Sequence, residues 1–357
     1  MASSFDPSRI RRIWVRAPNW LGDFVMATAT FRRLREGFPA AHITVGMRPY
    51  LRALLHGVNW FDEAVDAPPF RSPAALWRQV RAMRAQRFDL AVVLPNSLAT
   101  GLVPFLAGVP YRLGYRQGRP LLMNLGRTAK VLRRWWQPRE GPRRVPSPMP
   151  SYYHDLLDEL GLPPGGLRPE LAVTAEADAW VEQHLRDLGI APGTPLLLLV
   201  VGANFGASKL WPPERFAAAA RRLQSELGMR ALVLVGPKEV ELGEQIAAEG
   251  DAIALTQPVL PLDRLSALVR RGALMLTGDT GPRHVGVAFD VPVVCLMGPS
   301  DPNYTNYCLE HQTVLRKDLP CSPCQRKTCP LGHHDCMRLL TVDEVCEAAV
   351  ALLARTT

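Results

Sequence analysis

The sequence lacks a long apolar run, and it lacks the apolar N-terminal segment of a secretory signal. No stretch of about 18 uninterrupted apolar residues occurs, although hydrophobic residues make up 47% of the 357 residues. Residues 1–12 are mostly polar. A mean hydropathy near zero is typical of a soluble globular protein. We therefore expect a cytoplasmic protein, and a chain of this length favours two domains.

The sequence also lacks the two commonest nucleotide-binding motifs. No Gly-x-Gly-x-x-Gly follows the first apolar run, and no Walker sequence occurs. The usual sequence support for dinucleotide redox chemistry and for P-loop chemistry is therefore missing.

Acidic residues are scarce in the first part of the chain. Residues 1–150 contain 24 Lys and Arg against 8 Asp and Glu, a balance of +16, whereas residues 151–357 contain 18 against 25, a balance of −7. The first part suits an anionic partner such as a phosphorylated lipid, a nucleic acid or a polyanionic sugar. The acidic second part argues against a chain that wraps a polyanion along its whole length.

Apolar runs alternate with helical periodicity in both parts of the chain. Strand patterns cover 13–17, 42–47, 89–94, 196–201, 231–235, 273–276 and 291–297, and helical patterns cover 22–38, 74–86, 212–227, 239–249 and 341–355. Such alternation predicts α/β architecture with doubly wound parallel sheets. We expect domains at 1–170 and 171–357, with the helix 341–355, which opens on a capping box, packing back on the first.

Three clusters of polar residues follow predicted strands, where open α/β proteins bind ligands. Asp23 follows the tight turn at Gly22; taken by itself, it is better interpreted as a helix cap than as a base. Ser208 and Lys209 follow a glycine-rich turn and offer a hydroxyl and a positive charge to a diphosphate. Asp279, Thr280, Gly281 and Pro282 begin a helix whose free N–H groups suit phosphate, although capping alone also explains them.

Two further segments leave alternatives open. Four cysteines, Cys321, Cys324, Cys329 and Cys336, lie near His333 and His334 and are compatible with a structural zinc site or with reduced, packed thiols. Residues 121–136 mix leucines and paired tryptophans with basic residues. That pattern fits an interfacial membrane segment or a surface helix packed on its domain.

Together these motifs resemble bacterial lipopolysaccharide heptosyltransferases of glycosyltransferase family 9, over residues 12–350 and in consistent order. The matching phrases are Trp20-Leu21-Gly22-Asp23, Leu94-Pro95-Asn96-Ser97, Ser208-Lys209-Leu210-Trp211-Pro212, Asp279 to His284, Val291-Pro292-Val293-Val294 and Gly298-Pro299-Ser300-Asp301-Pro302. The cysteine-rich stretch points to the heptosyltransferase II branch of the family.

The resemblance implies a GT-B fold with two facing Rossmann-like domains, a deep cleft between them, and no required cofactor or catalytic metal. The first domain would bind the acceptor, and the second would bind ADP-L-glycero-β-D-manno-heptose. The reaction would be an inverting transfer onto the first heptose of the inner core on Kdo-lipid A, at the inner leaflet of the membrane.

The resemblance also assigns roles to residues. Asp23 would be the general base and Lys209 the diphosphate contact, while Asp279, Thr280, Gly281, Pro282 and His284 would form the donor loop. Other substrate-binding residues would be Ser208, Asn96 and either Glu239 or Glu241, one of which would bind the ribose.

Two other functions compete with this interpretation. One is a different GT-B sugar-nucleotide glycosyltransferase of envelope or glycoprotein assembly. The other is a zinc-stabilised nucleic-acid-binding protein, suggested by the net charge of +9 and the cysteines. No basic stripe interleaved with aromatic residues is visible, and we therefore expect no nucleic-acid partner.

Overall fold

A computed structural model describes residues 5–132 and 143–356, and the chain divides into two compact units, Met1–Pro169 and Glu170–Thr357. We refer to them as unit 1 and unit 2. The helices and strands of unit 1 are β1 Arg12–Arg16, α1 Leu21–Met26, α2 Thr28–Gly37, β2 His42–Met47, β3 Glu63–Asp66, α3 Pro73–Gln86, β4 Leu90–Val93, α4 Leu98–Leu106, β5 Tyr111–Gly114, β6 Val131–Leu132, β7 Arg143–Arg144 and α5 Met149–His154.

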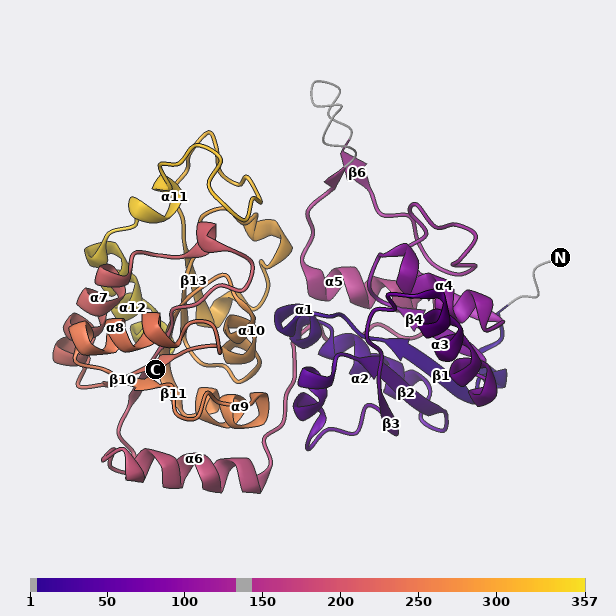
Figure 1. Cartoon of the computed structure of the whole chain (residues 1–357), viewed down its shortest axis with the longest axis horizontal. Helices are drawn as coiled ribbons and strands as arrows, with labels where there is room; N and C mark the ends of the chain where they lie inside the picture. The colour runs from indigo at the N-terminus through magenta and orange to yellow at the C-terminus, as the bar shows by residue number, and fades with distance from the viewer. Residues whose placement is uncertain (1–4, 133–142, 357) are drawn as a thin grey trace. The chain divides into compact units, whose positions relative to one another are not determined.

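The main sheet of unit 1 has five parallel strands in the order β3-β2-β1-β4-β5. Trp14, Ala91 and Val93 on one face pack against α3 and α4, which lie side by side in Figure 1. The order in which the chain adds strands to the sheet reverses between β1 and β4, and we call this position the reversal point of the sheet. The loops that follow these two strands therefore open side by side at the same edge.

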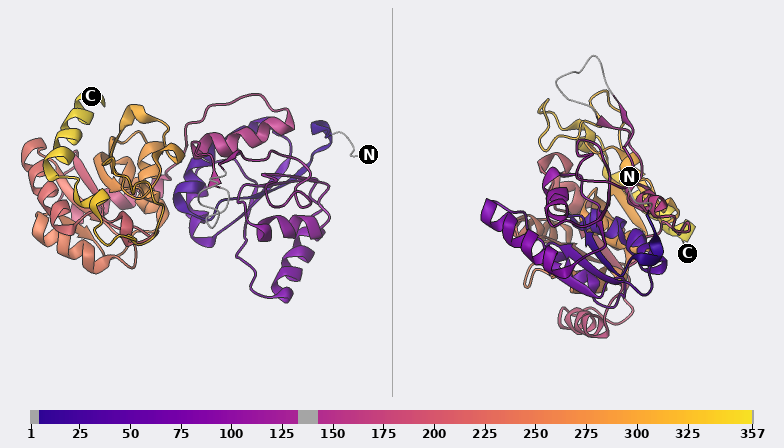
Figure 2. Two further views of the ribbon diagram at one scale, coloured as in Figure 1. Left: turned by 90° about the horizontal axis from the view of Figure 1, so that it is seen from above. Right: turned by 90° about the vertical axis from the view of Figure 1, so that its right-hand side faces the viewer.

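Unit 2 repeats the architecture with one more strand. Its elements are α6 Ala175–Asp187, β8 Leu196–Val200, α7 Pro213–Leu227, β9 Arg230–Leu234, α8 Val240–Gly250, β10 Ile253–Leu255, α9 Leu262–Arg270, β11 Gly272–Gly278, α10 Gly281–Ala288, β12 Val293–Leu296, β13 Gln312–Leu315, α11 Asp335–Arg338 and α12 Val342–Thr356. The parallel order is β10-β9-β8-β11-β12-β13. Helices lie on either side of the strands (Figure 2). The α/β fold expected from the alternating pattern is confirmed.

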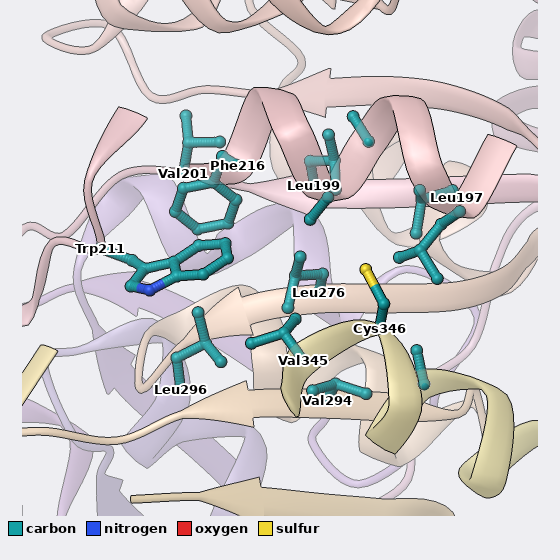
Figure 3. Packing of buried hydrophobic residues seen from close by; sticks show 14 of the residues in the cluster. Leu197, Leu199, Val201, Trp211, Phe216, Leu276, Val294, Leu296, Val345 and Cys346 are labelled. Atoms are coloured by element: carbon teal, nitrogen blue, oxygen red, sulfur yellow. The ribbon is translucent and has the colours of Figure 1, made fainter. Parts of the chain in front are cut away.

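The core of unit 2 shows why its strands read as continuous apolar runs. Leu197, Leu199 and Leu276 point to one face of the sheet and meet Phe216 of α7 and Val345 of α12 (Figure 3). On the other face α10 comes close to the sheet because Gly286 has no side chain, and a Cβ there would lie 3.3 Å from the sulfur of Met275. Both faces are therefore covered, as parallel sheets require.

The C-terminal helix α12 packs on α7, β12 and β13 of its own unit. The predicted capping box is present: the Glu344 carboxylate accepts from the N–H of Thr341 at 2.9 Å, and the Thr341 hydroxyl accepts from the N–H of Glu344 at 3.2 Å.

Two expectations about helices are wrong. The pattern over 22–38 is interrupted at Ala27, because the Thr28 hydroxyl bonds the Val25 carbonyl and α2 starts anew. Residues 121–132 form no helix; Pro120 precedes them, and Gly126, at φ +117°, lies within them. The basic and tryptophan pairs at 133–136 lie outside the described residues. Within the described chain, no helix is long and apolar enough to cross a membrane.

Candidate active site

Most of the predicted site residues lie at the reversal points of the two sheets. In unit 1 the helix α1, which follows β1, carries Asp23 and the loop after β4 carries Asn96, and these two strands are hydrogen-bonded neighbours. In unit 2 the loop after β8 carries Lys209 and the loop after β11 carries Asp279. Ligands of open α/β proteins bind at such points.

Asp23 stands in the first turn of α1, which its carboxylate complements electrostatically. The hydroxyl of Tyr153 on α5 donates to Asp23 Oδ1 at 3.2 Å. Burial raises the pKa of Tyr153 well above its usual value, and the negative charge of Asp23 raises it further. Tyr153 therefore stays protonated and fixes the orientation of the carboxylate.

Asn96 is held in place by a hydrogen bond to Tyr152 of α5. Its amide donates to the Tyr152 hydroxyl at 2.8 Å, and Tyr152 stacks on Tyr115 with ring centroids 3.8 Å apart. The guanidinium of Arg144 covers the Tyr152 ring at 3.8 Å. Arg119, mostly buried, bonds the Ser97 carbonyl beside Asn96 at 3.0 Å.

Sequence reasoning missed this support. Tyr152 and Tyr153 belong to none of the helices expected from the sequence pattern, and their partners lie 56 and 130 residues away in the chain. The adjacent pair of tyrosines was the available signal, but it does not reveal which loops they contact.

Lys209 and Asp279 form an ion pair at the reversal point of unit 2. The ammonium donates to Asp279 Oδ2 at 2.6 Å and to its main-chain carbonyl at 2.8 Å. Buried Arg283 approaches the other carboxylate oxygen at 3.2 Å. Burial alone would raise the pKa of Asp279, but the charges of Lys209 and Arg283 outweigh it and hold that pKa well below its usual range. The three side chains leave a local positive charge.

The helix α10 begins without a side-chain cap. Its N-cap residue Thr280 makes no capping hydrogen bond; the Thr280 hydroxyl instead lies 3.3 Å from that of Thr277. Gly281 and Pro282 form the first helical positions. Capping by the Thr280 side chain does not explain this motif, and the N-terminal turn of the helix suits an anion.

His284 lies behind this turn. It is buried, its Nδ1 is 2.6 Å from the Tyr307 hydroxyl, and the two rings stack. Burial, followed by the charge of Arg283, lowers the pKa of His284 to about 3. The imidazole is therefore neutral at physiological pH, and it contacts the side chain of Tyr307.

The two candidate glutamates have different surroundings. Glu239, the N-cap residue of α8, accepts from the N–H of Gly236 at 2.8 Å. Its carboxylate also faces Gly202, where a Cβ would lie 2.1 Å from the Glu239 carboxyl carbon. Glu239 thus reaches the ends of both β8 and β9, whereas Glu241 is exposed on α8.

The hydroxyl of Ser208, which was expected to contact the substrate, bonds to another segment of the protein. It is 3% exposed, and its hydroxyl donates to the Arg326 carbonyl at 2.5 Å. Its N–H donates to the Lys327 carbonyl at 3.1 Å, and its own carbonyl accepts from His334 Nε2 at 2.6 Å. Ser208 fastens the Lys209 turn to the cysteine-rich segment, and its hydroxyl is already committed there.

The four clustered cysteines line one small cavity together with His333 and His334. Burial and the neighbouring thiols raise the pKa of Cys336 to about 11. Among residues 5–132 and 143–356, no group of three or more His, Cys, Asp or Glu is arranged to hold a metal ion. The zinc interpretation is not supported.

Comparison with known proteins identifies the family of the chain. Residues 76–334 match the model of glycosyltransferase family 9 (heptosyltransferase). The lipopolysaccharide heptosyltransferase 2 of Salmonella typhimurium is 28% identical over 96% of this chain and 99% of its own length, and that of Escherichia coli is 28% identical over 96% and 98%.

Solved structures give the same result. The structure of E. coli ADP-heptose LPS heptosyltransferase II superimposes with a TM-score of 0.77, at 27% identity over 96% of this chain and 99% of that one. A family 9 glycosyl transferase from Veillonella parvula has a TM-score of 0.82 at 23% identity, over 99% of each chain, and shows the shared fold.

Proposed function

We propose that this protein, which belongs to glycosyltransferase family 9, the heptosyltransferases, transfers heptose from ADP-heptose to the first heptose of the lipopolysaccharide inner core. The observation that carries the proposal is the charge cluster at the start of α10. Lys209 and Arg283 surround a single carboxylate beside an uncapped helix N-terminus, and this arrangement suits a diphosphate. Relatives named lipopolysaccharide heptosyltransferase 2 support this choice of substrates.

In the proposed reaction, Asp23 accepts the proton of the acceptor hydroxyl as that oxygen bonds to the anomeric carbon of the donor. The bond from that carbon to the diphosphate breaks, and ADP leaves with the electron pair. Lys209 and the N–H groups at the start of α10 stabilise the charge that develops on the diphosphate. A single displacement of this kind inverts the anomeric centre and needs no covalent intermediate.

On the same proposal, Glu239 binds the ribose hydroxyls, because its carboxylate reaches the ends of β8 and β9 and Glu241 does not. Asn96 lies on the acceptor side. The neutral imidazole of His284 supports the donor loop through Tyr307. The acceptor is lipid-linked, and we propose that the protein associates peripherally with the inner leaflet.

The test is ADP release from ADP-heptose in the presence of a panel of truncated lipopolysaccharide cores, with product masses measured. Release that requires a core carrying one heptose supports the proposal. Equal release with a heptose-free core, or release with another sugar nucleotide and none with ADP-heptose, contradicts it.

A further inference from the structure

The outer face of α4 is apolar and exposed. Leu98, Leu102 and Phe105 are spaced at i, i+4 and i+7 and therefore share one side of the helix. The side chains of Leu98 and Phe105 are 61% and 41% exposed, whereas Val103 on the opposite side is buried in the core. A helix of a soluble domain normally places polar residues on its outer face, so α4 departs from the expected pattern.

A second segment extends this apolar surface. Leu121 is 82% exposed and lies two residues after Arg119, whose guanidinium bonds the Ser97 carbonyl at the start of α4. The next residue, Leu122, packs against Gly101 of α4 and offers its carbonyl to Arg112 at 2.8 Å. The Arg112 guanidinium in turn lies 5.4 Å from the centre of the Phe105 ring.

Cations border the same surface along α3. Trp77, Arg81 and Arg84 share one side of α3, and Arg84 bonds the Leu106 carbonyl at the end of α4 at 2.7 Å. Residues 67–88 contain five arginines and no Asp or Glu. Within the described parts of the chain, no carboxylate forms an ion pair with Arg78 or Arg81.

We propose that this face of unit 1, formed by Trp77, Arg78, Arg81, Leu98, Phe105 and Leu121, docks on a bilayer that contains anionic lipid. Exposed leucine and aromatic side chains flanked by unpaired arginines suit a surface with apolar depth and negative headgroups. A second copy of the chain would have to bring these arginines against each other, which disfavours that occupant.

The location fits a lipid-linked acceptor, and in this respect the inference rests on the proposed function. The helix α4 begins at Leu98, two residues after Asn96, at the edge of the sheet where the Asp23 loop opens. A bilayer on the outer face of α4 would hold the sugars of its lipid near that edge. Residues 121–136 are the segment whose sequence fits an interfacial membrane segment. Of these residues, the proposed docking surface includes Leu121 alone.

The experiment measures cosedimentation of the full chain with vesicles. We expect binding to vesicles of phosphatidylglycerol and phosphatidylcholine and at least tenfold weaker binding to pure phosphatidylcholine. The triple variant Leu98→Ser/Phe105→Ser/Leu121→Ser and the pair Arg78→Gln/Arg81→Gln each weaken binding at least tenfold. Leu309→Ser, at a residue 45% exposed in unit 2, and Arg186→Gln are matched controls that retain it. The single variant Leu121→Ser gives the same test with little risk to folding.

The same variants distinguish this inference from the proposed function. If the surface only binds the membrane, each variant releases ADP at the wild-type rate when the acceptor is a delipidated core. Failure of the wild-type protein to bind anionic vesicles overturns the surface, and so does equal loss in the controls. Light scattering measures the molar mass of the protein in solution. If a variant changes this mass but leaves vesicle binding unchanged, the face serves self-association instead. Vesicle binding without heptose transfer retains the surface and rejects the function.

Discussion

Tyr153 and Asp23 are hydrogen-bonded at the edge of the unit 1 sheet where we propose that the acceptor binds. The tyrosine is buried and protonated, so it presents a hydrogen to one carboxylate oxygen and fixes the plane of the group. A base that must meet a hydroxyl in one orientation benefits from this constraint, because misplacement is costly in rate.

Replacing the carboxylate tests the role of Asp23 directly. Asp23→Asn keeps the shape and the contact with Tyr153 but accepts no proton, so we expect turnover to fall by about 10²–10⁴. Because we propose that ADP binds to unit 2, we expect the affinity for ADP, measured by calorimetry, to stay unchanged. Asp66→Asn, at an exposed carboxylate paired with Arg52, serves as the control. Normal turnover in the Asp23→Asn variant would exclude Asp23 as the base.

His284 makes stability depend on pH. Its pKa in the folded protein is about 3, below the value of 6.5 in an unfolded chain, so the unfolded state binds the proton more readily. The stabilisation is complete above about pH 6.5 and is lost as the pH falls toward 3, by up to about 1.4 kcal/mol per unit.

Urea unfolding at pH 7 and pH 5 measures this effect. We expect a drop in the free energy of unfolding for the wild-type protein and a smaller drop for His284→Gln, whose amide carries no titrating proton. His56→Gln, at an exposed histidine, retains the wild-type dependence. An identical pH dependence in the His284 and His56 variants would exclude this linkage.

At the scale of elements, the cysteine-rich segment 321–336 holds the turn that carries Lys209. Gly206 lies so close to this segment that a Cβ would be 2.4 Å from the Lys327 carbonyl, and its φ of +153° also favours glycine. With three hydrogen bonds to Ser208, the segment fixes where the ammonium of Lys209 can reach.

Loss of one of these hydrogen bonds should weaken ADP binding. His334→Ala removes the donor to the Ser208 carbonyl, a contribution of about 1 kcal/mol, so we expect the Kd for ADP to rise about fivefold. His333→Ala is the matched control, since His333 lies on the same segment and faces Asp335 instead. Calorimetry distinguishes the two variants; equal effects would indicate general loosening of the segment rather than positioning of Lys209.

The elements that sequence analysis predicted well have local signals. The apolar run 42–47 coincides with β2, and the capping box places the start of α12. The strand β3, Glu63–Asp66, was missed because it has two acidic residues among four and stands at the sheet edge.

The position of Asp23 followed from a tight turn after a strand. The true partner of Ser208 lies 118 residues away, and no periodicity reveals such a contact.

At the scale of the whole molecule, each unit has its own core and its own reversal point. Trp14 and Val80 belong to the core of unit 1, while Leu199 and Phe216 belong to that of unit 2. The charge differs too, with the basic excess in the first 150 residues and the acidic excess after them. Each unit can therefore respond separately to its ligand.

Binding of ADP should stabilise unit 2 selectively, because Lys209, Glu239 and the start of α10 all belong to it. At 100 times Kd, a ligand that binds the folded state alone adds about 2.7 kcal/mol to the free energy of unfolding. Hydrogen exchange read by mass spectrometry should show slower exchange in peptides that cover β8, β11 and α10, with little change in β1 and β4. Lys209→Ala removes the ammonium from the proposed donor site and should abolish the protection. Protection confined to unit 1 would reverse the assignment of donor and acceptor.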